Sequence, residues 1–524
     1  MRRCVLICGI LLATLLFLHG GVALVGDPAP EDALERFFAA EGEQQVLAAI
    51  DAIVASGATV EEVASRLREG RSYAAELPRG WQVYELVSSD GVTRPFHLFV
   101  PEDYDPAERV PLLFDLHGAV MGPGFTVAEL APRRALWETA ASAAGFLVIM
   151  PHGDEQAPWW SELGRGNLLA ELALAKRLYN VDEDRVFLSG FSDGGSGAFW
   201  MALHDPTPWA GFISLYGNPT VAAYGDYRCY PRNLLNRPIR AANGAYDAIY
   251  PASELRLIYD QMLLLGVGLE WSVYGTGHDL SFFADEEAQS VAFIERVVRR
   301  PLFERVIWET DDSAVGRCDW VRIDRVADVG NNAPFDNVNL WYPSGSGDFG
   351  AAIGAQGGEE GFRVAGVVPG TVAHLAGIRS GDLIVSIDGR TVRSSFDLQA
   401  VMATTQPGQL LSIEIRRDGA PLTLSGTVPG LDPIYTQRDL VGTIDVAVDG
   451  NRIDVAVRNV AAYTLFLSSE MFELERPLVV TTNGAVTFDG VVETDLRFML
   501  ERAAVDNDRS TVYEAGLQIL VPPM

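Results

Sequence analysis

The stretch VFLSGFSDGG, residues 186–195, constrains the fold more than any other part of this 524-residue chain. An apolar run suited to a buried strand ends in Gly-x-Ser-x-Gly, and the apolar sequence from residue 198 to residue 203 is typical of a helix. A serine in so sharp a strand-to-helix turn has a strained backbone, and bulky side chains at Gly190 and Gly194 would clash there. The pattern therefore predicts that Ser192 projects above the edge of a sheet as a nucleophile.

Strand-like and helix-like segments alternate around this turn, from about residue 80 to residue 300. A β-hairpin is expected over 81–100, and apolar runs have the composition of buried parallel strands. These strands are expected at 111–116, 146–150, 185–189, 210–215, 238–242 and 269–274, with helices near 133–144, 167–178, 254–264 and 286–298. The alternation predicts a doubly wound α/β sheet, whose sites lie at the carboxyl ends of its strands.

Three of the seven histidines follow Ser192, and their positions separate them. His204 falls on the helix after the serine, about three turns away, and His374 belongs to a later unit. His278 remains, in the loop GTGHD after the last apolar strand. Where a serine nucleophile sits on such a sheet, the acid and then the histidine follow it in the chain. His278 is therefore predicted to take the proton of Ser192.

The acid and the oxyanion-stabilising amides are predicted from the same order of elements. Asp247 comes directly after the strand 238–242, where its carboxylate can hold the second imidazole nitrogen, and Asp226 is the alternative. Backbone amides that stabilise a developing oxyanion are expected just after the nucleophile, at Asp193, and beyond the strand 111–116. Ala119 is chosen for the second amide, with Gly118 as its alternative.

The substrate pocket is predicted from side chains on loops at the same edge of the sheet. His117 precedes the serine in the chain and is expected to brace its loop there. Trp159 and Trp160 are adjacent in a loop after the strand 146–150. They either wall a pocket for an acyl, aryl or sugar group or plug the edge of the domain.

Charge and the first residues indicate where the chain works. The formal net charge is −30, which repels nucleic acid and anionic lipid and excludes both as partners. Arg2 and Arg3 precede an apolar run that ends at Leu18, so residues 1–26 are predicted to be a signal peptide for secretion or a periplasmic location. The run is short for a membrane span, although an uncleaved anchor is the alternative. Cys229 and Cys318 then remain, either paired or as two buried thiols.

The motifs LHG (116–118), PHGD (151–154), GFSDGG (190–195) and GH (277–278), taken with Asp247, resemble a known family. They are similar to the secreted α/β-hydrolase esterases related to polyhydroxybutyrate depolymerases, feruloyl esterases and acetyl-xylan esterases. Peptidases of prolyl-oligopeptidase type are more distant relatives. The resemblance covers roughly residues 80–300. It implies hydrolysis of carboxylic esters through an acyl-enzyme on Ser192, with no cofactor and no metal.

A second resemblance lies in the sequence VVPGTVA (367–373), AGIRSGDLI (376–384) and IDGRTV (387–392). The order of these motifs resembles a PDZ domain of the bacterial envelope type, spanning 347–429. Such a domain implies binding of a C-terminal peptide, or of a partner protein, as an added strand. The loop matching the one that captures the terminal carboxylate contains Phe349, Gly350, Ala351 and Ala352. A groove occupied internally and used only for packing is the alternative.

The sequence on both sides of this unit is β-like. Alternating apolar residues end at Asp449-Gly450, and Asn483-Gly484 signals a second hairpin. One β-rich domain interrupted by the PDZ unit is predicted, and separate sequential domains are the alternative. The predicted order is a signal peptide (1–26), a helical N-terminal segment (27–78), an α/β-hydrolase domain (79–300), β-rich sequence (301–346), a PDZ domain (347–429) and β-rich sequence (430–524).

The helical segment is interpreted as a helical pair packed on the catalytic domain, or alternatively as a pro-segment or a cap over the active site. The whole chain is predicted to be a secreted serine hydrolase that cleaves carboxylic esters, with a PDZ module for peptide or partner binding. Two alternatives remain. One is a serine peptidase of prolyl-oligopeptidase type that uses the PDZ domain to hold substrate. The other is a non-catalytic envelope scaffold.

Overall fold

The computed structural model describes residues 33–225, 229–327, 338–343, 349, 356–358, 360–367, 371–437 and 440–522. The predicted signal peptide lies outside the described residues. The same is true of Asp226 and of Gly350, Ala351 and Ala352. No helix within the described ranges is long and apolar enough to cross a membrane.

The centre of the molecule is an eight-stranded sheet with the strand order β1-β2-β4-β3-β5-β6-β7-β8. The first two strands form the predicted hairpin, β2 runs antiparallel to β4, and the pairs from β4 through β8 are parallel. The strands are β1 (Gly80–Val87), β2 (Thr93–Val100), β3 (Val110–Leu116), β4 (Leu147–Met150), β5 (Val181–Phe191), β6 (Gly211–Leu215), β7 (Ile239–Gly244) and β8 (Leu269–Tyr274).

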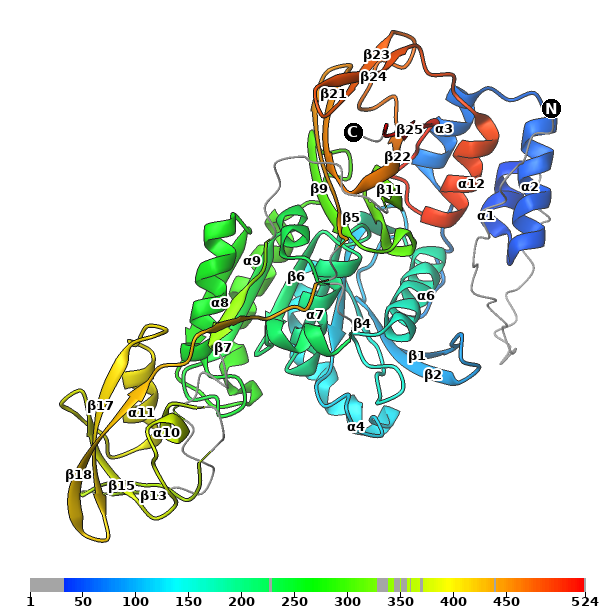
Figure 1. Ribbon diagram of the computed structural model, residues 1–524. Coiled ribbons are helices and arrows are strands. Elements are labelled where there is room, and N and C mark those ends of the chain that lie inside the picture. Colours follow the sequence, from blue (N-terminus) through cyan, green and yellow to red (C-terminus); the bar gives the residue numbers. More distant parts are fainter. Residues whose placement is uncertain are drawn as a thin grey trace.

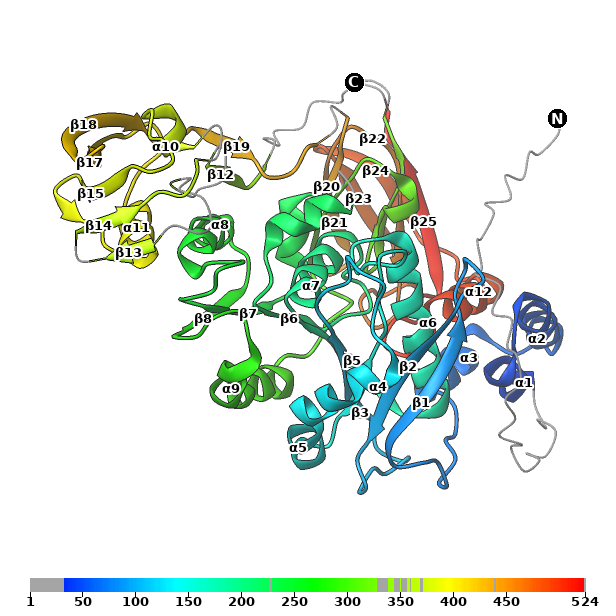
Figure 2. The ribbon, with the colours of Figure 1, turned by 90° about the horizontal axis from the view of Figure 1, so that it is seen from below.

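Helices cover both faces of this sheet (Figure 2). Along β3, Leu112 and Phe114 face one core and Leu113 faces the other, as the period of two in a strand requires. The first core is closed by α6 (Glu162–Leu178), α7 (Asp193–His204) and α8 (Ala252–Leu265). The second is closed by α5 (Ala135–Ala144) and α9 (Phe283–Arg296). A short helix, α4 (Val127–Leu130), lies in the connection after β3. The predicted doubly wound α/β sheet is therefore confirmed.

The β-rich sequence forms two sheets that share one apolar core. The first sheet has the order β24-β23-β21-β20-β9 and the second β10-β11-β22-β25, so strands from before and after residues 347–429 pair in both. We call these two sheets the C-terminal sandwich. Its strands are β9 (Arg305–Thr310), β10 (Arg317–Cys318), β11 (Val321–Val326), β20 (Gly442–Asp449), β21 (Arg452–Arg458), β22 (Val460–Leu467), β23 (Leu478–Thr482), β24 (Ala485–Gly490) and β25 (Ala515–Leu520).

The region between the two halves of the sandwich forms its own six-stranded sheet and its own core. It projects from the end of the molecule that carries α8 (Figure 1). The short strands β12 (Trp341–Pro343) and β19 (Leu431–Pro433), which pair with each other, lead into it and out of it. Its elements are β13 (Gln356–Gly358), β14 (Gly361–Arg363), α10 (Val372–Leu375), β15 (Leu383–Ile387), β16 (Arg390–Thr391), α11 (Ser395–Met402), β17 (Leu410–Arg417) and β18 (Ala420–Thr427).

Three N-terminal helices lie at the opposite end of the molecule (Figure 1). These are α1 (Ala33–Ala39), α2 (Glu43–Ala55) and α3 (Val60–Glu69), and α3 begins with a capping box formed by Thr59 and Glu62. Their apolar faces bury against α12 (Leu496–Asp506) in one small core. The interpretation of this segment as a helical pair packed on the catalytic domain is therefore corrected, because the main partner is a helix of the C-terminal sequence. Cys229 and Cys318 are two buried thiols and not a disulfide.

Candidate active site

Ser192 lies at the turn between β5 and α7 with φ 57° and ψ −117°. Residues with a side chain rarely adopt this backbone conformation, and it persists only where the surroundings impose it. Here the glycines allow the chain segments to touch. A Cβ added at Gly190 would lie 2.4 Å from the carbonyl carbon of Gly194, and one added at Gly194 would lie 2.1 Å from the carbonyl oxygen of Leu116. The structure thus forms the strand–serine–helix turn that the sequence predicted.

Ser192, His278 and Asp247 are connected by two short hydrogen bonds. Nε2 of His278 lies 2.8 Å from Oγ of Ser192, and Nδ1 of His278 lies 2.7 Å from Oδ2 of Asp247. The loops after β7 and β8, which are adjacent parallel strands, bring Asp247 and His278 to the carboxyl edge beside the turn. The structure therefore brings together the three side chains that the sequence selected from three separate segments.

Asp247 is held in its ionised form. Its side chain is fully buried, and Oδ1 accepts hydrogen bonds from the backbone amides of Ile249 at 2.7 Å and Tyr250 at 2.9 Å. Burial alone would raise the pKa of Asp247, but the hydrogen bond with His278 and the two amides outweigh it and lower that pKa. An ionised carboxylate here fixes the proton on Nδ1 of His278 and leaves Nε2 free to accept one from Ser192.

Aromatic rings that the sequence reasoning missed surround His278. The ring centroids of Phe191, Tyr250 and Tyr216 lie 5.1, 5.6 and 6.0 Å from that of the imidazole. The hydroxyl of Tyr216 also hydrogen bonds with Thr276, two residues before His278. Phe191 was predictable as the neighbour of the nucleophile, but no sequence pattern assigns the tyrosines to the imidazole. The rings restrict the orientation of His278.

The loop after β3 packs directly on the nucleophile. A Cβ added at Gly118 would lie 3.0 Å from Cβ of Ser192, and Ala119 has a positive φ of 59°. The side chain of Asp193 ties this loop to α7, because its Oδ2 accepts from the amide of Val120 at 2.9 Å. Burial raises the pKa of Asp193, although the amides of Val120 and Ala119 favour the ionised form. The Asp193 side chain therefore fixes the position of the loop that carries Ala119.

His117, Trp159 and Trp160 are all buried, with exposed fractions of only 2%, 2% and 3%. Nε2 of His117 accepts from the amide of Gly153 at 3.0 Å, and Nε1 of Trp159 donates to the carbonyl of His117 at 2.8 Å. Burial lowers the pKa of His117 to about 4, so the ring is neutral and can accept. The burial of Trp159 and Trp160 in the apolar core favours the alternative in which they plug the edge of the domain, and the contacts of His117 agree with its expected role of bracing the loop.

The remaining histidine candidates lie elsewhere. His204 stacks on Trp200 at the far end of α7, and His374 is exposed on α10. A buried ion pair between Asp115 and Arg133, 2.8 Å apart, lies beneath the loop after β3 and was not anticipated. Within the described part of the chain, no group of three or more His, Cys, Asp or Glu side chains is placed to hold a metal ion.

A doubly wound sheet with this strand order, and with a serine at the sharp turn after its fifth strand, defines an α/β-hydrolase. Comparison with known proteins agrees with that class. Residues 90–352 match the family described as "Putative esterase", which is half of the chain, and residues 347–428 match the PDZ domain. The chain belongs to this esterase family. It also carries a PDZ domain.

Individual relatives match short parts of the chain. It is 33% identical over 108 residues to the bifunctional acetylxylan esterase/xylanase XynS20E of Neocallimastix patriciarum, covering 20% of this chain and 15% of that protein. It is 34% identical over 70 residues to the periplasmic pH-dependent serine endoprotease DegQ of Escherichia coli, covering 13% of this chain and 15% of that one. The chain thus matches about one seventh of the length of these curated relatives.

Solved structures similar to this chain include a thermostable esterase, with 21% identity, a TM-score of 0.35, and coverage of 42% of this chain and 63% of that one. An S-formylglutathione hydrolase from Staphylococcus aureus is another, with 15% identity, a TM-score of 0.33, and coverage of 41% and 98%.

Proposed function

We propose that this chain is an exported serine esterase that hydrolyses carboxylic esters through an acyl-enzyme on Ser192. The hydrogen-bonded series Ser192–His278–Asp247, with distances of 2.8 and 2.7 Å, carries this proposal. It places a base within reach of the nucleophile and a buried carboxylate behind the base, which is the arrangement that activates a serine hydroxyl. Membership of the esterase family supports an ester as the substrate.

In the acylation step, Oγ of Ser192 attacks the ester carbonyl carbon while Nε2 of His278 takes the hydroxyl proton. Asp247 stabilises the imidazolium through Nδ1–H. The tetrahedral oxyanion is stabilised by the backbone amides of Asp193 and Ala119. Collapse of the intermediate breaks the ester C–O bond, and His278 returns the proton to the departing alcohol.

In the deacylation step, a water molecule takes the place of the alcohol. His278 removes a proton from the water as its oxygen attacks the acyl carbon, and then returns that proton to Oγ of Ser192. The products are a carboxylic acid and the free enzyme. Every side chain used belongs to the segment from β1 to α9, which we call the hydrolase region.

The PDZ domain is proposed to bind a C-terminal peptide or a partner protein as an added strand. Support comes from the similarity of residues 347–428 to PDZ domains and from the separate core of this unit. Export is proposed from the residues before position 27, and the periplasmic location of the relative from Escherichia coli is consistent with it.

The test replaces Ser192 in the whole chain and measures hydrolysis of a short aryl ester. Ser192→Ala should lower kcat by roughly 10⁴- to 10⁶-fold with KM little changed, since the hydroxyl acts in the chemical step. Ser281→Ala is the matched control, because Ser281 is exposed and lies only three residues from His278. Activity that survives in Ser192→Ala would exclude the assignment. Faster cleavage of peptides than of esters would favour a peptidase instead.

A further inference from the structure

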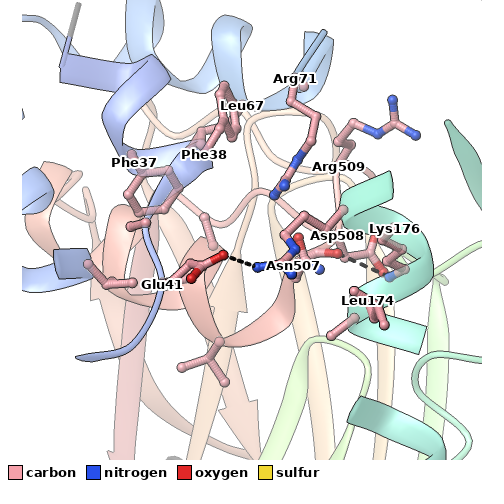
Figure 3. Close-up of a pocket in the computed structure, with 18 of the residues that line it drawn as sticks. Phe37, Phe38, Glu41, Leu67, Arg71, Leu174, Lys176, Asn507, Asp508 and Arg509 are labelled. Carbon is pink, nitrogen blue, oxygen red and sulfur yellow. Dashed lines mark hydrogen bonds and ion pairs between the residues drawn. The ribbon is translucent and has the colours of Figure 1, made fainter. Parts of the chain in front are cut away.

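A cavity of about 510 Å³ lies far from the catalytic serine, between three parts of the chain that are distant in sequence. The N-terminal helices form one side, α6 forms another, and the end of α12 with the segment after it forms the third (Figure 3). The volume is within the range of sites that hold small molecules, about 300 to 1,000 Å³. Ser192, Asp247 and His278 are not among the residues that line it.

Two turns give the cavity its shape. At the end of α3, Gly70 has φ +83°, and a Cβ there would lie 2.5 Å from Cδ of Arg509, so the chain turns sharply against that arginine. At the end of α12, Asn507 has φ 43°, and its carbonyl accepts from Nζ of Lys176 at 3.0 Å. Because both turns are anchored to neighbouring segments, Arg71 is placed at the cavity by the fold.

Of the charged side chains that line the cavity, all but Arg71 bind or face a group that balances their charge. Arg509 binds Glu183 with two hydrogen bonds of 2.8 Å, and Arg177 binds Glu41 at 2.7 Å. Asp508 is bound by Arg299 at 2.6 Å, from outside the cavity. Lys176, besides its contact with Asn507, is close enough to Asp508 to favour its ionised form.

Arg71 differs from these cations. Among the residues that the structure describes, no carboxylate lies within ion-pair distance of its guanidinium, which stands 5.8 Å from the ring centroid of Phe38. Burial is the main cause that lowers the pKa of Arg71, Arg177 and Arg509 lower it further, and Tyr73 and Glu183 only partly oppose them. A guanidinium remains charged in proteins, so this position is a positive charge in need of an anion.

The walls beside this charge are largely apolar. Figure 3 shows Arg71 extending toward Asn507 and Asp508, with Phe37 and Phe38 on one side and Leu174 on the other. Leu67, Val505 and Val512 also line the space. A ligand that satisfies both features has one anionic group and an apolar body. The acidic side chains already present disfavour a dianion, because each added negative charge would face Glu41, Glu183 and Asp508.

We propose that this cavity binds a small organic monocarboxylate with an apolar tail. The carboxylate accepts two parallel hydrogen bonds from the guanidinium of Arg71, a geometry that suits both groups. The tail lies along Phe37, Phe38 and Leu174. A ligand bound there contacts the N-terminal helices, the hydrolase region and the C-terminal sequence together, and so stabilises their association.

The first experiment measures octanoate binding to the whole chain by calorimetry and by the shift in Tm. Octanoate is expected to bind with a submillimolar Kd, and Arg71→Met should weaken it roughly 10- to 100-fold, because a charge-assisted hydrogen-bonded pair is lost. Arg66→Met is the matched control, since Arg66 lies on α3 only five residues before Arg71 but does not line the cavity and already pairs with Glu35 and Glu69. Equal octanoate affinity in the parent and in Arg71→Met would overturn the proposal. The same result is expected if octanoate binds only at the active site around Ser192, so that outcome would count against the proposal too.

The second experiment varies the ligand. Affinity should rise roughly threefold to fourfold per CH₂ from acetate to butyrate to octanoate, as burial of the tail requires. Octanamide, which has the tail without the charge, should bind at least tenfold more weakly than octanoate. Octanamide as tight as octanoate would overturn the charge recognition. Inorganic phosphate as tight as octanoate would overturn the monocarboxylate class.

A second variant guards against misfolding of Arg71→Met. Removing an unpaired, partly buried charge should leave the ligand-free Tm unchanged or higher. Ala173→Glu keeps Arg71 but adds a carboxylate from α6 at the cavity wall, where Ala173 is only half-buried. That side chain should pair with Arg71 and abolish octanoate binding. Octanoate binding retained in a folded Ala173→Glu protein would contradict the assigned location.

Discussion

Buried arginine–carboxylate pairs attach the C-terminal sandwich and the segment after α12 to the hydrolase region. Arg237 and Asp319 are 2% and 0% exposed, with atoms as close as 2.5 Å. Arg232–Glu309 and Arg509–Glu183 are further pairs of the same kind, and Arg299, just after α9, binds both Asp184 of the hydrolase region and Asp508. Arg237 also donates to the carbonyl of Trp209 at 2.6 Å. Ions are stable in such positions only when both partners are in place, so these surfaces fold as one unit.

The PDZ domain is attached through contacts of the opposite character. Gln261 of α8 exchanges two hydrogen bonds with the backbone of Trp341, and Tyr342 donates to Glu254 at 2.6 Å. The PDZ side chain Phe396 packs edge-on against Tyr246, and these two residues are 51% and 56% exposed. The contacts of Gln261 with Trp341 and of Phe396 with Tyr246 are exposed and contribute little stability. The comparison teaches that the sandwich is built into the hydrolase region, whereas the PDZ domain is a tethered module.

The largest expected effect is a difference in kcat between substitutions at two adjacent residues. Tyr246 faces the PDZ domain, and Asp247 faces His278. Asp247→Asn should lower kcat by about 10⁴-fold, because an amide favours the wrong tautomer of the imidazole. Tyr246→Ala should change kcat only a few-fold. Steady-state kinetics on a short aryl ester, with circular dichroism to verify folding, checks both. Comparable activity of Asp247→Asn and the parent would remove Asp247 from the mechanism.

The next effect compares an ion pair between the hydrolase region and the C-terminal sandwich with an ion pair inside the PDZ domain. Arg237→Met leaves Asp319 buried without its partner and should destabilise the hydrolase region and the sandwich together by about 3 to 5 kcal/mol. Arg417→Met is the matched variant within the PDZ domain, where Arg417 binds Asp382 at 2.7 Å. It should lower only the PDZ transition in calorimetry. A Tm of the hydrolase region that falls equally in both variants would show that the PDZ domain is not a separate unit.

A smaller effect depends on pH. His97 is fully buried, and burial lowers its pKa from 6.5 to about 4. The unfolded chain therefore takes up a proton near pH 6.5 that the folded chain does not accept until about pH 4. The contribution of neutral His97 to the free energy of unfolding is therefore fully present above pH 6.5 and is lost as the pH falls toward 4. The glutamine in His97→Gln can still accept a hydrogen bond from Arg134 but does not titrate. Between pH 7 and pH 4, the free energy of unfolding of this variant should therefore fall by on the order of 2 to 3 kcal/mol less than that of the parent.

The PDZ domain provides the internal reference for this pH test. Its one histidine, His374, is exposed, and Arg417 lowers the pKa of Asp382 below its usual value. The stability contributed by Asp382 is therefore kept above about pH 4 and lost only as the pH falls through that lowered pKa. Chemical denaturation followed at several pH values measures both transitions. The same pH dependence in His97→Gln and in the parent would contradict the assignment to His97.

The smallest expected effect is that of removing the PDZ domain. Replacing residues 347–429 by a short Gly/Ser bridge should leave kcat/KM for a small aryl ester within a few-fold of the parent, because no catalytic side chain comes from that segment and loop closure has a modest entropic cost. The isolated domain should bind C-terminal peptides in the micromolar range or more weakly. Loss of activity in a folded deletion variant would show that the PDZ domain completes or gates the active site.

The sequence predicted those features that depend on local constraints. The turn at Ser192 requires two glycines at fixed positions, and the order of strands restricts His278 and Asp247 to single loops, so the hydrogen-bonded series could be anticipated. The partners against which each element packs could not be anticipated from the sequence. The amphipathic pattern of α3 shows that Val63 is buried but not that its partner is α12, more than 400 residues away. The pattern around Trp159 likewise does not distinguish a pocket wall from a core ring, because both are apolar.

Covalent trapping of the acyl group tests the central claim most directly. The whole chain is mixed with an aryl acetate, quenched with acid within the first turnovers, digested and examined by mass spectrometry. We predict an acetyl group on Ser192 in the parent, no acetyl group in Ser192→Ala, and the same labelling of Ser192 after deletion of residues 347–429. An acetyl group on another residue, or turnover of the ester with Ser192 never labelled, would contradict the account.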